Sequence, residues 1–263
     1  MVAHIVATTT PSHLCTFTVV RLPARRVPLT LATVPLRRAQ LATTPGAAFT
    51  RLLGTGRGDS TAPGADLRRW ATFVAWDEPP DLAAWHHRMA RSRLRVKGAD
   101  GGNGAGGTEG TDGADGANGR DGAECWTVLL ETISAHGRWA GHALDVPGVA
   151  PAASGPVAVL TRATVHLARL RQFRAAVPAV DGVLLRAGGR RASIGFGEWP
   201  VAVQGTFSVW DDGTAMQRFA RDDPVHAEVV RRTRAQGWYR EELFARFRPL
   251  ASMGAWAGRD PLA

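Results

Sequence analysis

The chain of 263 residues repeats two short motifs in the same order in its two halves, and this duplication restricts the folds open to it more than any other feature. Residues 72–77 (TFVAWD) match residues 206–211 (TFSVWD), and residues 137–141 (GRWAG) share G-x-W-A-G with residues 254–258 (GAWAG). Each copy of the first motif is a strand-like run of β-branched and aromatic residues that ends in an acidic turn residue. The chain is therefore predicted to contain two similar structural units.

A third and weaker pair of motifs fits the same order, with residues 54–56 (GTG) placed on residues 195–197 (GFG). The offset between the copies then falls from 141 to 134 to 117 residues along the chain. Loops of unequal length in the two halves would produce this drift.

Both halves follow the order strand, helix, strand, strand, helix, strand, which is that of a ferredoxin-like unit. In the first half we expect strands at 15–22, 49–54, 70–76 and 125–133, and helices up to 42 and at 81–96. In the second half we expect strands at 157–163, 192–197 and 203–210, helices at 169–176 and across 214–247, and a tail through 256 as the last strand. Each sheet has an apolar face that needs cover. The expected fold class is therefore α+β, with duplicated ferredoxin-like units forming an intramolecular dimeric α+β barrel.

Composition divides the chain into these units and their connections. We expect a flexible N-terminus at 1–12, a first α+β half at 13–145, a linker at 146–156 and a second α+β half at 157–263. The first half contains a Gly/Asp-rich insert at 98–122, which lacks the apolar surface needed to repay the entropy of ordering. We predict that this insert is disordered, because it also lacks the regular apolar position of a calcium-binding nonapeptide repeat.

Charge and motif content exclude several classes of function. The net charge of +9 rests almost wholly on arginine, and no nucleic-acid-binding module accompanies it, so nucleic acid is not an expected partner. Two cysteines cannot form a disulfide framework, and a cytoplasmic protein is expected. No phosphate-binding G-x-x-x-x-G-K-[ST] or hydrolase G-x-S-x-G occurs, and no apolar run is long enough to cross a bilayer. The arginine-rich surface is compatible with peripheral contact to the inner face of a membrane.

His226 is the most informative single residue. Asp223 is a natural N-cap, Pro224 a natural first helical residue and Gly237 a natural stop, so a helix is predicted between them. On this helix His226 shares one face with Val229, at a spacing that points the imidazole inward. An inward histidine is more often a hydrogen-bonded core residue, but a neutral imidazole in an apolar setting is also what haem iron uses as a ligand.

The aromatic residues divide by their place in the repeat. Four tryptophans occupy repeat-equivalent positions and are expected to pack in the core: Trp76, Trp139, Trp210 and Trp256. Trp199 and Trp238 have no such partner, and together with Phe196 they are candidates for lining a tunnel that holds a long apolar ligand.

A longer set of motifs resembles the spheroidene monooxygenase family. In the second half the resemblance is carried by residues 195–200 (GFGEWP), 204–210 (QGTFSVW), 226–233 (HAEVVRRT) and 238–247 (WYREELFARF). In the first half it is carried by residues 44–46 (TPG), 54–56 (GTG) and 72–76 (TFVAW). The resemblance covers most of the chain outside the N-terminus and the Gly/Asp-rich insert, which is not part of the family's pattern.

The resemblance implies a dimeric α+β barrel and oxygen-dependent ketolation of an acyclic carotenoid such as spheroidene near its end group. It further implies haem as cofactor, O₂ as co-substrate and reduced ferredoxin as electron donor. His226 would be the metal ligand, and Arg221 and Glu198 would lie near the haem propionates or the oxygen pocket. Two alternatives stay open at this point. One is a cofactor-free monooxygenase of the same fold acting on an aromatic, polyketide-like substrate, and the other is a carrier that holds an apolar ligand in the barrel.

Overall fold

The computed structural model describes residues 13–57, 64–92, 124–146, 155–198 and 203–263. Its strands are β1 (Leu14–Arg21), β2 (Ala47–Gly56), β3 (Ala65–Trp76), β4 (Glu124–Gly137), β5 (Val157–Val165), β6 (Arg190–Glu198), β7 (Val203–Trp210) and β8 (Tyr239–Gly254). Its helices are η1 (Ala24–Arg26), α1 (Val27–Ala32), α2 (Val34–Ala42), α3 (Leu82–Ser92), η2 (Leu167–Arg169), α4 (Leu170–Arg186), α5 (Gly213–Gln217), η3 (Arg218–Asp222) and α6 (Pro224–Gln236). The N-terminus at 1–12, the insert at 98–122 and most of the linker at 146–156 fall outside the described residues.

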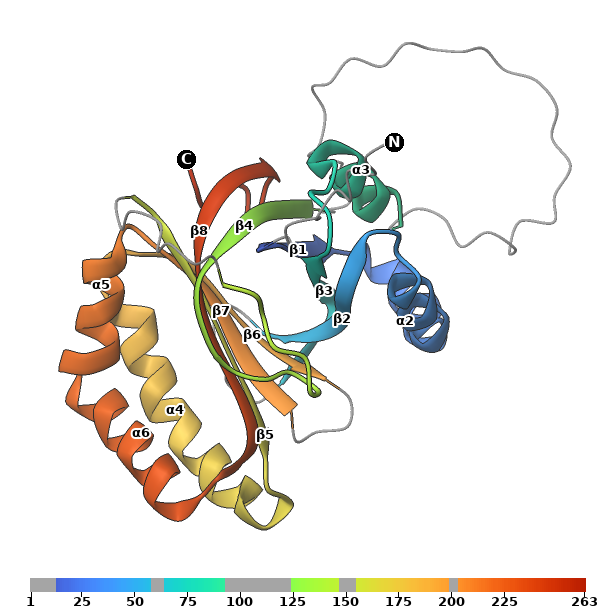
Figure 1. Cartoon of the computed structure of the whole chain (residues 1–263). Helices are drawn as coiled ribbons and strands as arrows, with labels where there is room; N and C mark the ends of the chain where they lie inside the picture. The colour runs from blue at the N-terminus through green and yellow to red at the C-terminus, as the bar shows by residue number, and fades with distance from the viewer. Residues whose placement is uncertain (1–12, 58–63, 93–123, 147–154, 199–202) are drawn as a thin grey trace, which may run out of the picture.

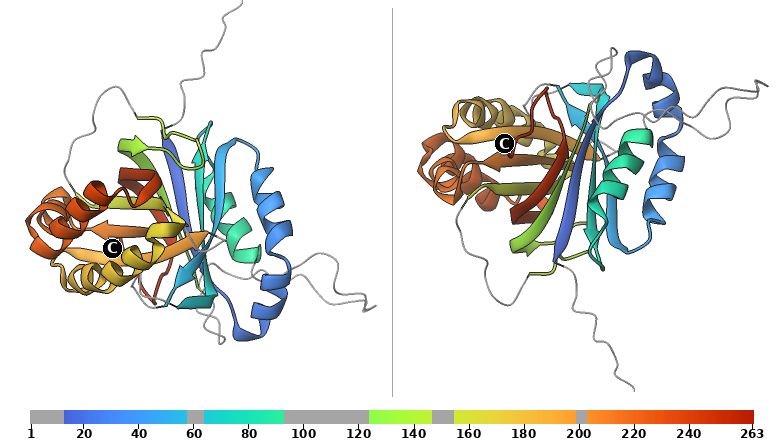
Figure 2. Two further views of the ribbon diagram at one scale, coloured as in Figure 1. Left: turned by 90° about the horizontal axis from the view of Figure 1, so that it is seen from below. Right: turned by 90° about the horizontal axis from the view of Figure 1, so that it is seen from above.

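The strands form one closed antiparallel barrel in the order β1-β3-β2-β6-β7-β5-β8-β4. Each half contributes four consecutive strands to it, and the two layers of helices, α1–α3 and α4–α6, lie on opposite sides of the barrel (Figures 1 and 2). The expected fold class, an α+β protein in which duplicated ferredoxin-like units form an intramolecular dimeric α+β barrel, is confirmed. Among the described helices, none is long and apolar enough to cross a membrane.

The halves meet along two unequal seams. β4 and β8 pair over most of their length, from Trp126 opposite Gly254 to Gly137 opposite Leu243, whereas β2 and β6 pair only at their ends. At the short seam Gly54 faces Gly197. The register also corrects the third motif pair, because Gly54 lies opposite residue 70 of β3 and Gly197 lies opposite residue 204 of β7. With the TFVAWD and TFSVWD motifs superposed, the structural counterpart of Gly54 is therefore Gly197 and not Gly195.

Aromatic side chains fill the interior of the barrel. The rings of Phe17 and Phe207 stack with centroids 4.0 Å apart, and Trp139 lies 5.3 Å from Phe73 and 6.0 Å from Phe196. The four repeat-equivalent tryptophans are all buried, as the sequence predicts. A barrel of eight strands has an interior just wide enough for its own side chains. The described part of the barrel interior is therefore occupied largely by core side chains.

The helical prediction for 214–247 is wrong in its last part. Residues 239–247 belong to strand β8, where Leu243, Ala245 and Phe247 are buried in the barrel and the residues between them face outward. The run of charged residues suggested a solvated helix face, but the alternation of period two decides the structure. Helix α4 also continues past the predicted end at 176 to Arg186, with Pro178 inside it.

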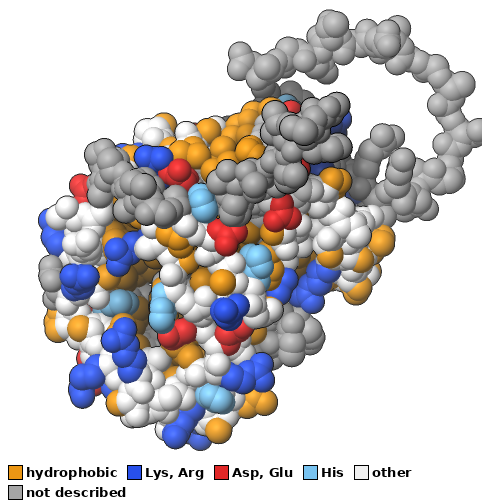
Figure 3. Space-filling view, viewed as in Figure 1, with side chains coloured by type: hydrophobic (Ala, Val, Ile, Leu, Met, Phe, Trp, Pro, Cys, Tyr) orange, Lys and Arg blue, Asp and Glu red, His pale blue; other side chains and the backbone are white. Residues whose placement is uncertain are grey.

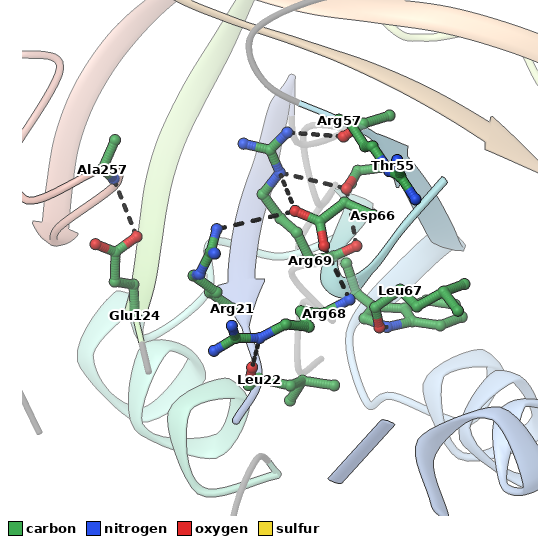
Figure 4. Close-up of polar contacts among 12 residues, drawn as sticks. Arg21, Leu22, Thr55, Arg57, Asp66, Leu67, Arg68, Arg69, Glu124 and Ala257 are labelled. Atoms are coloured by element: carbon green, nitrogen blue, oxygen red, sulfur yellow. Dashed lines mark hydrogen bonds and ion pairs between the residues drawn. The ribbon is translucent and has the colours of Figure 1, made fainter. Parts of the chain in front are cut away.

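The G-x-W-A-G motifs form the same turn at the ends of β4 and β8. Gly137 and Gly254 have φ of 88° and 80°, and a Cβ on either would overlap a carbonyl oxygen of the neighbouring strand. The turn after β4 donates the N–H groups of residues 140 and 141 to the carboxylate of Glu241, and the turn after β8 donates those of residues 257 and 258 to Glu124. The second contact appears in Figure 4 beside a separate group in which Asp66 pairs with arginines of β1 and β3. The duplication thus extends to individual hydrogen bonds.

Candidate active site

In the first half, helices α1–α3 cover the outer face of the sheet (Figures 1 and 2). Leu52, Thr72, Thr18 and Thr127 form a row across the four strands of this half. Thr18 is fully buried, its hydroxyl pairs with that of Thr127 at 3.1 Å, and it accepts a hydrogen bond from Trp85 Nε1 of α3 at 3.2 Å. The indole covers Thr18, and a small cavity of about 30 Å³ beside it is lined by Leu52 and Thr72 of the same row together with Thr30 and Met89 of the helices.

The corresponding row of the second half is partly open. Gly195, Thr206, Thr161 and Phe244 lie side by side across β6, β7, β5 and β8 on the outer face, and we call them the open row. The two threonines are half-buried, and Phe244 is 40% exposed. The Thr161 and Thr206 hydroxyls hydrogen-bond each other at 2.6 Å. This row has threonines at the same two central positions as the row of the first half, but no indole N–H donates to it.

The difference traces to one aromatic position in the helix layer. Trp85 packs on Trp76 with ring centroids 5.1 Å apart, and its counterpart Phe219 packs on Trp210 at 5.3 Å. A phenyl ring has no N–H to donate, so no bond equivalent to that between Trp85 and the sheet can form in the second half. There the threonine hydroxyls pair with each other instead.

The helices of the second half contact the sheet at the two ends of the layer. At one end Leu184 and Met216 pack in a buried cluster with Trp210. At the other end Trp238 is fully buried, with Phe173 of α4 against it at a centroid distance of 6.3 Å. Between these anchors Asp181 of α4 and Thr233 of α6 are buried, whereas His226 and the threonines of the open row stay half-buried. The open row is therefore more exposed than the corresponding row of the first half.

His226 lies on α6 in this layer, next to Phe219 at a centroid distance of 4.8 Å. The predicted helix is confirmed, because Asp223 accepts from the N–H groups of residues 225 and 226 and Gly237 ends the helix at φ 57°. His226 Nδ1 lies 3.0 Å from the carbonyl oxygen of Ala220. Since a carbonyl can only accept, Nδ1 carries the proton and Nε2 carries the lone pair. No hydrogen bond to Nε2 is found among the described residues.

Burial lowers the pKa of His226 below its usual value, although the Ala220 carbonyl and the Asp223 carboxylate act in the opposite direction. The imidazole is therefore neutral at pH 7. A neutral histidine whose Nδ1–H is held by a backbone carbonyl is the arrangement that metal-ligating histidines adopt.

The other predicted site residues separate into two places. Arg221 is exposed just before α6, and Trp238 is buried at the end of that helix with its Nε1 donating to Gln236 at 2.8 Å. Phe196 and Glu198 alternate with glycines along β6 and face the inside of the barrel, on the opposite side of the sheet from α6. Trp199 lies outside the described residues. The structure thus groups His226, Arg221 and Trp238 in one layer and does not place Phe196 or Glu198 with them.

Glu198 belongs to a cluster of charges at one mouth of the barrel. Its carboxylate accepts from Trp139 Nε1 at 2.5 Å and lies 3.4 Å from Arg51 and 3.9 Å from Arg162. Arg162 is 4% exposed and also pairs with Glu241. Burial alone would raise the pKa of Glu241, but the hydrogen bonds from the turn after β4 and from Arg162 outweigh it and lower the pKa. This cluster fastens the G-x-W-A-G turn, so Glu198 is engaged there.

Sequence reasoning missed Thr161 and Thr206 as site residues. Thr206 begins the TFSVWD motif, and its counterpart Thr72 begins TFVAWD, so the repeat marked the position but suggested only a structural role. What distinguishes the two is the cover above them, which depends on Trp85 and Phe219. A comparison of the residues that follow each motif would have supplied that signal.

No group of three or more potential metal-ligating side chains occurs in the described part of the chain. One histidine would nevertheless be enough to hold haem, because the porphyrin brings its own nitrogen ligands to the iron. The single oriented imidazole of α6 fits that requirement.

Three curated proteins similar to this chain are named spheroidene monooxygenase. The protein from Rhodobacter capsulatus is 31% identical over 242 residues, which are 90% of each chain. The protein from Rubrivivax gelatinosus is 32% identical and the match covers 82% of this chain and 73% of that one, and the protein from Cereibacter sphaeroides is 34% identical over 83% and 60%. The chain belongs to the spheroidene monooxygenase family.

Membership of the spheroidene monooxygenase family makes the protein an oxidoreductase of the monooxygenase type. A scan against protein-family models found no match. Among solved structures, aldoxime dehydratase in complex with butyraldoxime matches 90% of this chain and 79% of its own at a TM-score of 0.54 and 9% identity. A second aldoxime dehydratase structure matches at 0.53 and 10%. These similarities show a shared fold.

Proposed function

We propose that this member of the spheroidene monooxygenase family ketolates the end of an acyclic carotenoid, with O₂ as co-substrate, haem as cofactor and reduced ferredoxin as electron donor. The observation that carries the proposal is the combination of His226 and the open row in one half of the barrel. The relatives' name supplies the substrate class, and the lone oriented imidazole supports haem over a metal ion held only by protein side chains. When bound, haem would supply the activation of O₂.

The residues of the chain would hold the reactants. His226 would hold the haem iron through Nε2, since Nδ1 is already bonded to Ala220. Arg221 is exposed and could pair with a propionate at the edge of the layer. Phe244 presents an apolar surface on the sheet side, where the end of a polyene would lie. A carotenoid is longer than this layer, so its remainder would stay outside.

The outer surface suits a substrate that is drawn from a membrane. In the view of Figure 3, arginine side chains are spread among apolar and histidine side chains and are not gathered into one patch. What supports attraction to anionic lipid headgroups is the net charge of +9. We therefore include peripheral contact with the inner face of the membrane in the proposal.

The reaction consists of two hydroxylations at one carbon. Each converts a C–H bond into C–OH, places one oxygen atom of O₂ in the substrate and releases the other as water, and consumes two electrons and two protons. The second gives a geminal diol, which loses water to form the ketone. Reduced ferredoxin would supply the electrons one at a time.

The test is a haemin titration followed by an activity assay. Purified protein should develop a Soret band at one equivalent of haemin, His226→Ala should abolish or strongly weaken it, and the exposed His87→Ala on α3 should leave it unchanged. The wild type with reduced ferredoxin, O₂ and an acyclic carotenoid should then form ketone. Turnover without haem would favour the cofactor-free alternative, and tight carotenoid binding without product would favour a carrier. A Soret band unaffected in His226→Ala would remove this histidine as ligand.

A further inference from the structure

The open row contains one pair of polar side chains, Thr161 and Thr206, between Gly195 and Phe244. Thr161 and Thr206 alternate with buried residues of the core, Leu160 and Phe207, so their side chains project to the outer face toward the helix layer. Phe244 flanks the pair on one side and Gly195, which has no side chain, on the other. A ligand in contact with this row meets two hydroxyl groups between Gly195 and the ring of Phe244.

Counting hydrogen bonds shows what the pair offers. One hydroxyl proton is used between Thr161 and Thr206, at 2.6 Å, and the other is left to donate elsewhere. Both oxygens keep lone pairs. No further side-chain partner for either hydroxyl is found in the parts of the chain that the structure describes. The pair can therefore donate one hydrogen bond and accept another, which is the pattern that complements an alcohol.

In the first half, the threonines at the corresponding positions do not hydrogen-bond each other, so the fold does not depend on such a pair. The counterpart of Thr161 is Thr18, whose hydroxyl is consumed by Thr127 and Trp85. The counterpart of Thr206 is Thr72, which is buried and has no hydrogen-bond partner for its Oγ1 among the described residues. The donor–acceptor pair facing an accessible layer exists in the second half alone among the described rows.

A hydrocarbon gains nothing from such a pair and must desolvate it. The end of the polyene becomes polar only after the first hydroxylation, when it carries an alcohol. We propose that the Thr161–Thr206 pair binds the hydroxyl of this first product and keeps it in place for the second hydroxylation. The inference rests on the proposed function, and it assigns the pair a role in holding the intermediate that makes the enzyme a ketolase.

The experiment measures the ratio of released alcohol to ketone. Thr206→Val and Thr161→Val keep the β-branched shape that suits a strand and remove one hydroxyl each. The ratio should rise about tenfold in either variant, as the loss of one neutral hydrogen bond to the intermediate would give. The ratio reports on the second hydroxylation, because both products pass through the first. Thr206→Ser should restore the ratio, and Thr72→Val in the first half is the matched control and should leave it unchanged.

The outcomes separate the inference from the function it rests on. If the wild type forms no oxygenated carotenoid, the proposed function fails whatever the variants do. If the wild type forms ketone and both valine variants release no more alcohol than it does, the inference is overturned and the function stands. A loss of total turnover in Thr206→Val without accumulation of alcohol, at an unchanged unfolding midpoint, would overturn it as well.

Discussion

The two halves of the barrel share their strand order and their end turns but differ in how the helices meet the sheet. In the first half Trp85 reaches the sheet and donates to Thr18, which is fully buried. In the second half Phe219 occupies the matching place, and the threonine row beneath the helices is half-exposed. The two halves thus differ in the cover over the threonine row, and the half with the more exposed row carries His226.

The threonine hydroxyls of the two halves are suited to different roles, one to stability and the other to ligand binding. A buried hydroxyl with two partners and an indole above it is what a stable interface needs, and it leaves no room for a ligand. An accessible hydroxyl pair contributes less to folding and is free to bind a substrate. The variants below measure which interactions the halves share and which they do not.

The largest effect should come from the turns that the halves have in common. Gly137→Ala and Gly254→Ala each place a Cβ against a carbonyl of the adjacent strand at a positive φ. Each should lower the free energy of unfolding by about 4 kcal/mol, the sum of backbone strain and overpacking. Urea unfolding should give equal losses for the two. A loss confined to one variant would show that the turns are not equivalent in energy.

The two carboxylates that bind these turns, Glu241 and Glu124, should contribute different amounts to the free energy of unfolding. Glu241→Gln leaves the buried Arg162 with only the more distant Glu198 carboxylate, at 3.9 Å, and should cost about 3 kcal/mol. Glu124→Gln loses only hydrogen bonds to the N–H groups of the other turn and should cost about 1 kcal/mol. Equal losses of unfolding free energy in the two variants would mean that the charge cluster at the mouth of the barrel does not add to stability.

The effect of Glu241 should depend on pH. Its pKa in the folded protein is lowered, so its stabilising contribution is present above the unfolded pKa of about 4.5 and is lost as the pH falls through the folded value. The difference in unfolding free energy between the wild type and Glu241→Gln should therefore shrink on acidification below about pH 4.5. A difference that grows in acid would contradict this assignment.

The smallest change in unfolding free energy should distinguish the threonine row of the first half from the open row. Thr18→Val removes a buried hydroxyl that serves two partners and should cost about 2 kcal/mol. Thr161→Val removes one half-exposed hydrogen bond and should cost less than about 1 kcal/mol. Chemical denaturation of both variants would check this, and a larger loss for Thr161→Val would reverse the roles given to the two halves.

Much of the fold could be predicted because the signals were local. The two longer repeated motifs, the N-cap at Asp223 and the stop at Gly237 each specify short-range structure and were found as expected, whereas the short GTG and GFG pair was misaligned by two residues. The strand at 239–247 was missed because its charges alternate with apolar residues in a way that also suits a solvated helix. Local composition cannot decide such a segment when its partners, β4 and β5, are far away in the sequence.

The site could be predicted only in part, for a similar reason. His226 was found from helix periodicity, but the opposite orientation of Glu198 depends on which face of β6 turns inward once the barrel closes. The open row is a property of four strands together, and its accessibility depends on a helix residue that contacts it from outside. Neither can be read from one segment.

The most direct test of the account is a crystal structure of the protein after reconstitution with haemin. The account predicts one haem between α6 and the open row, with His226 Nε2 on the iron and the first half empty. Haem bound in the first half, or bound through another residue with His226 still turned to Ala220 and Nε2 free, would contradict it.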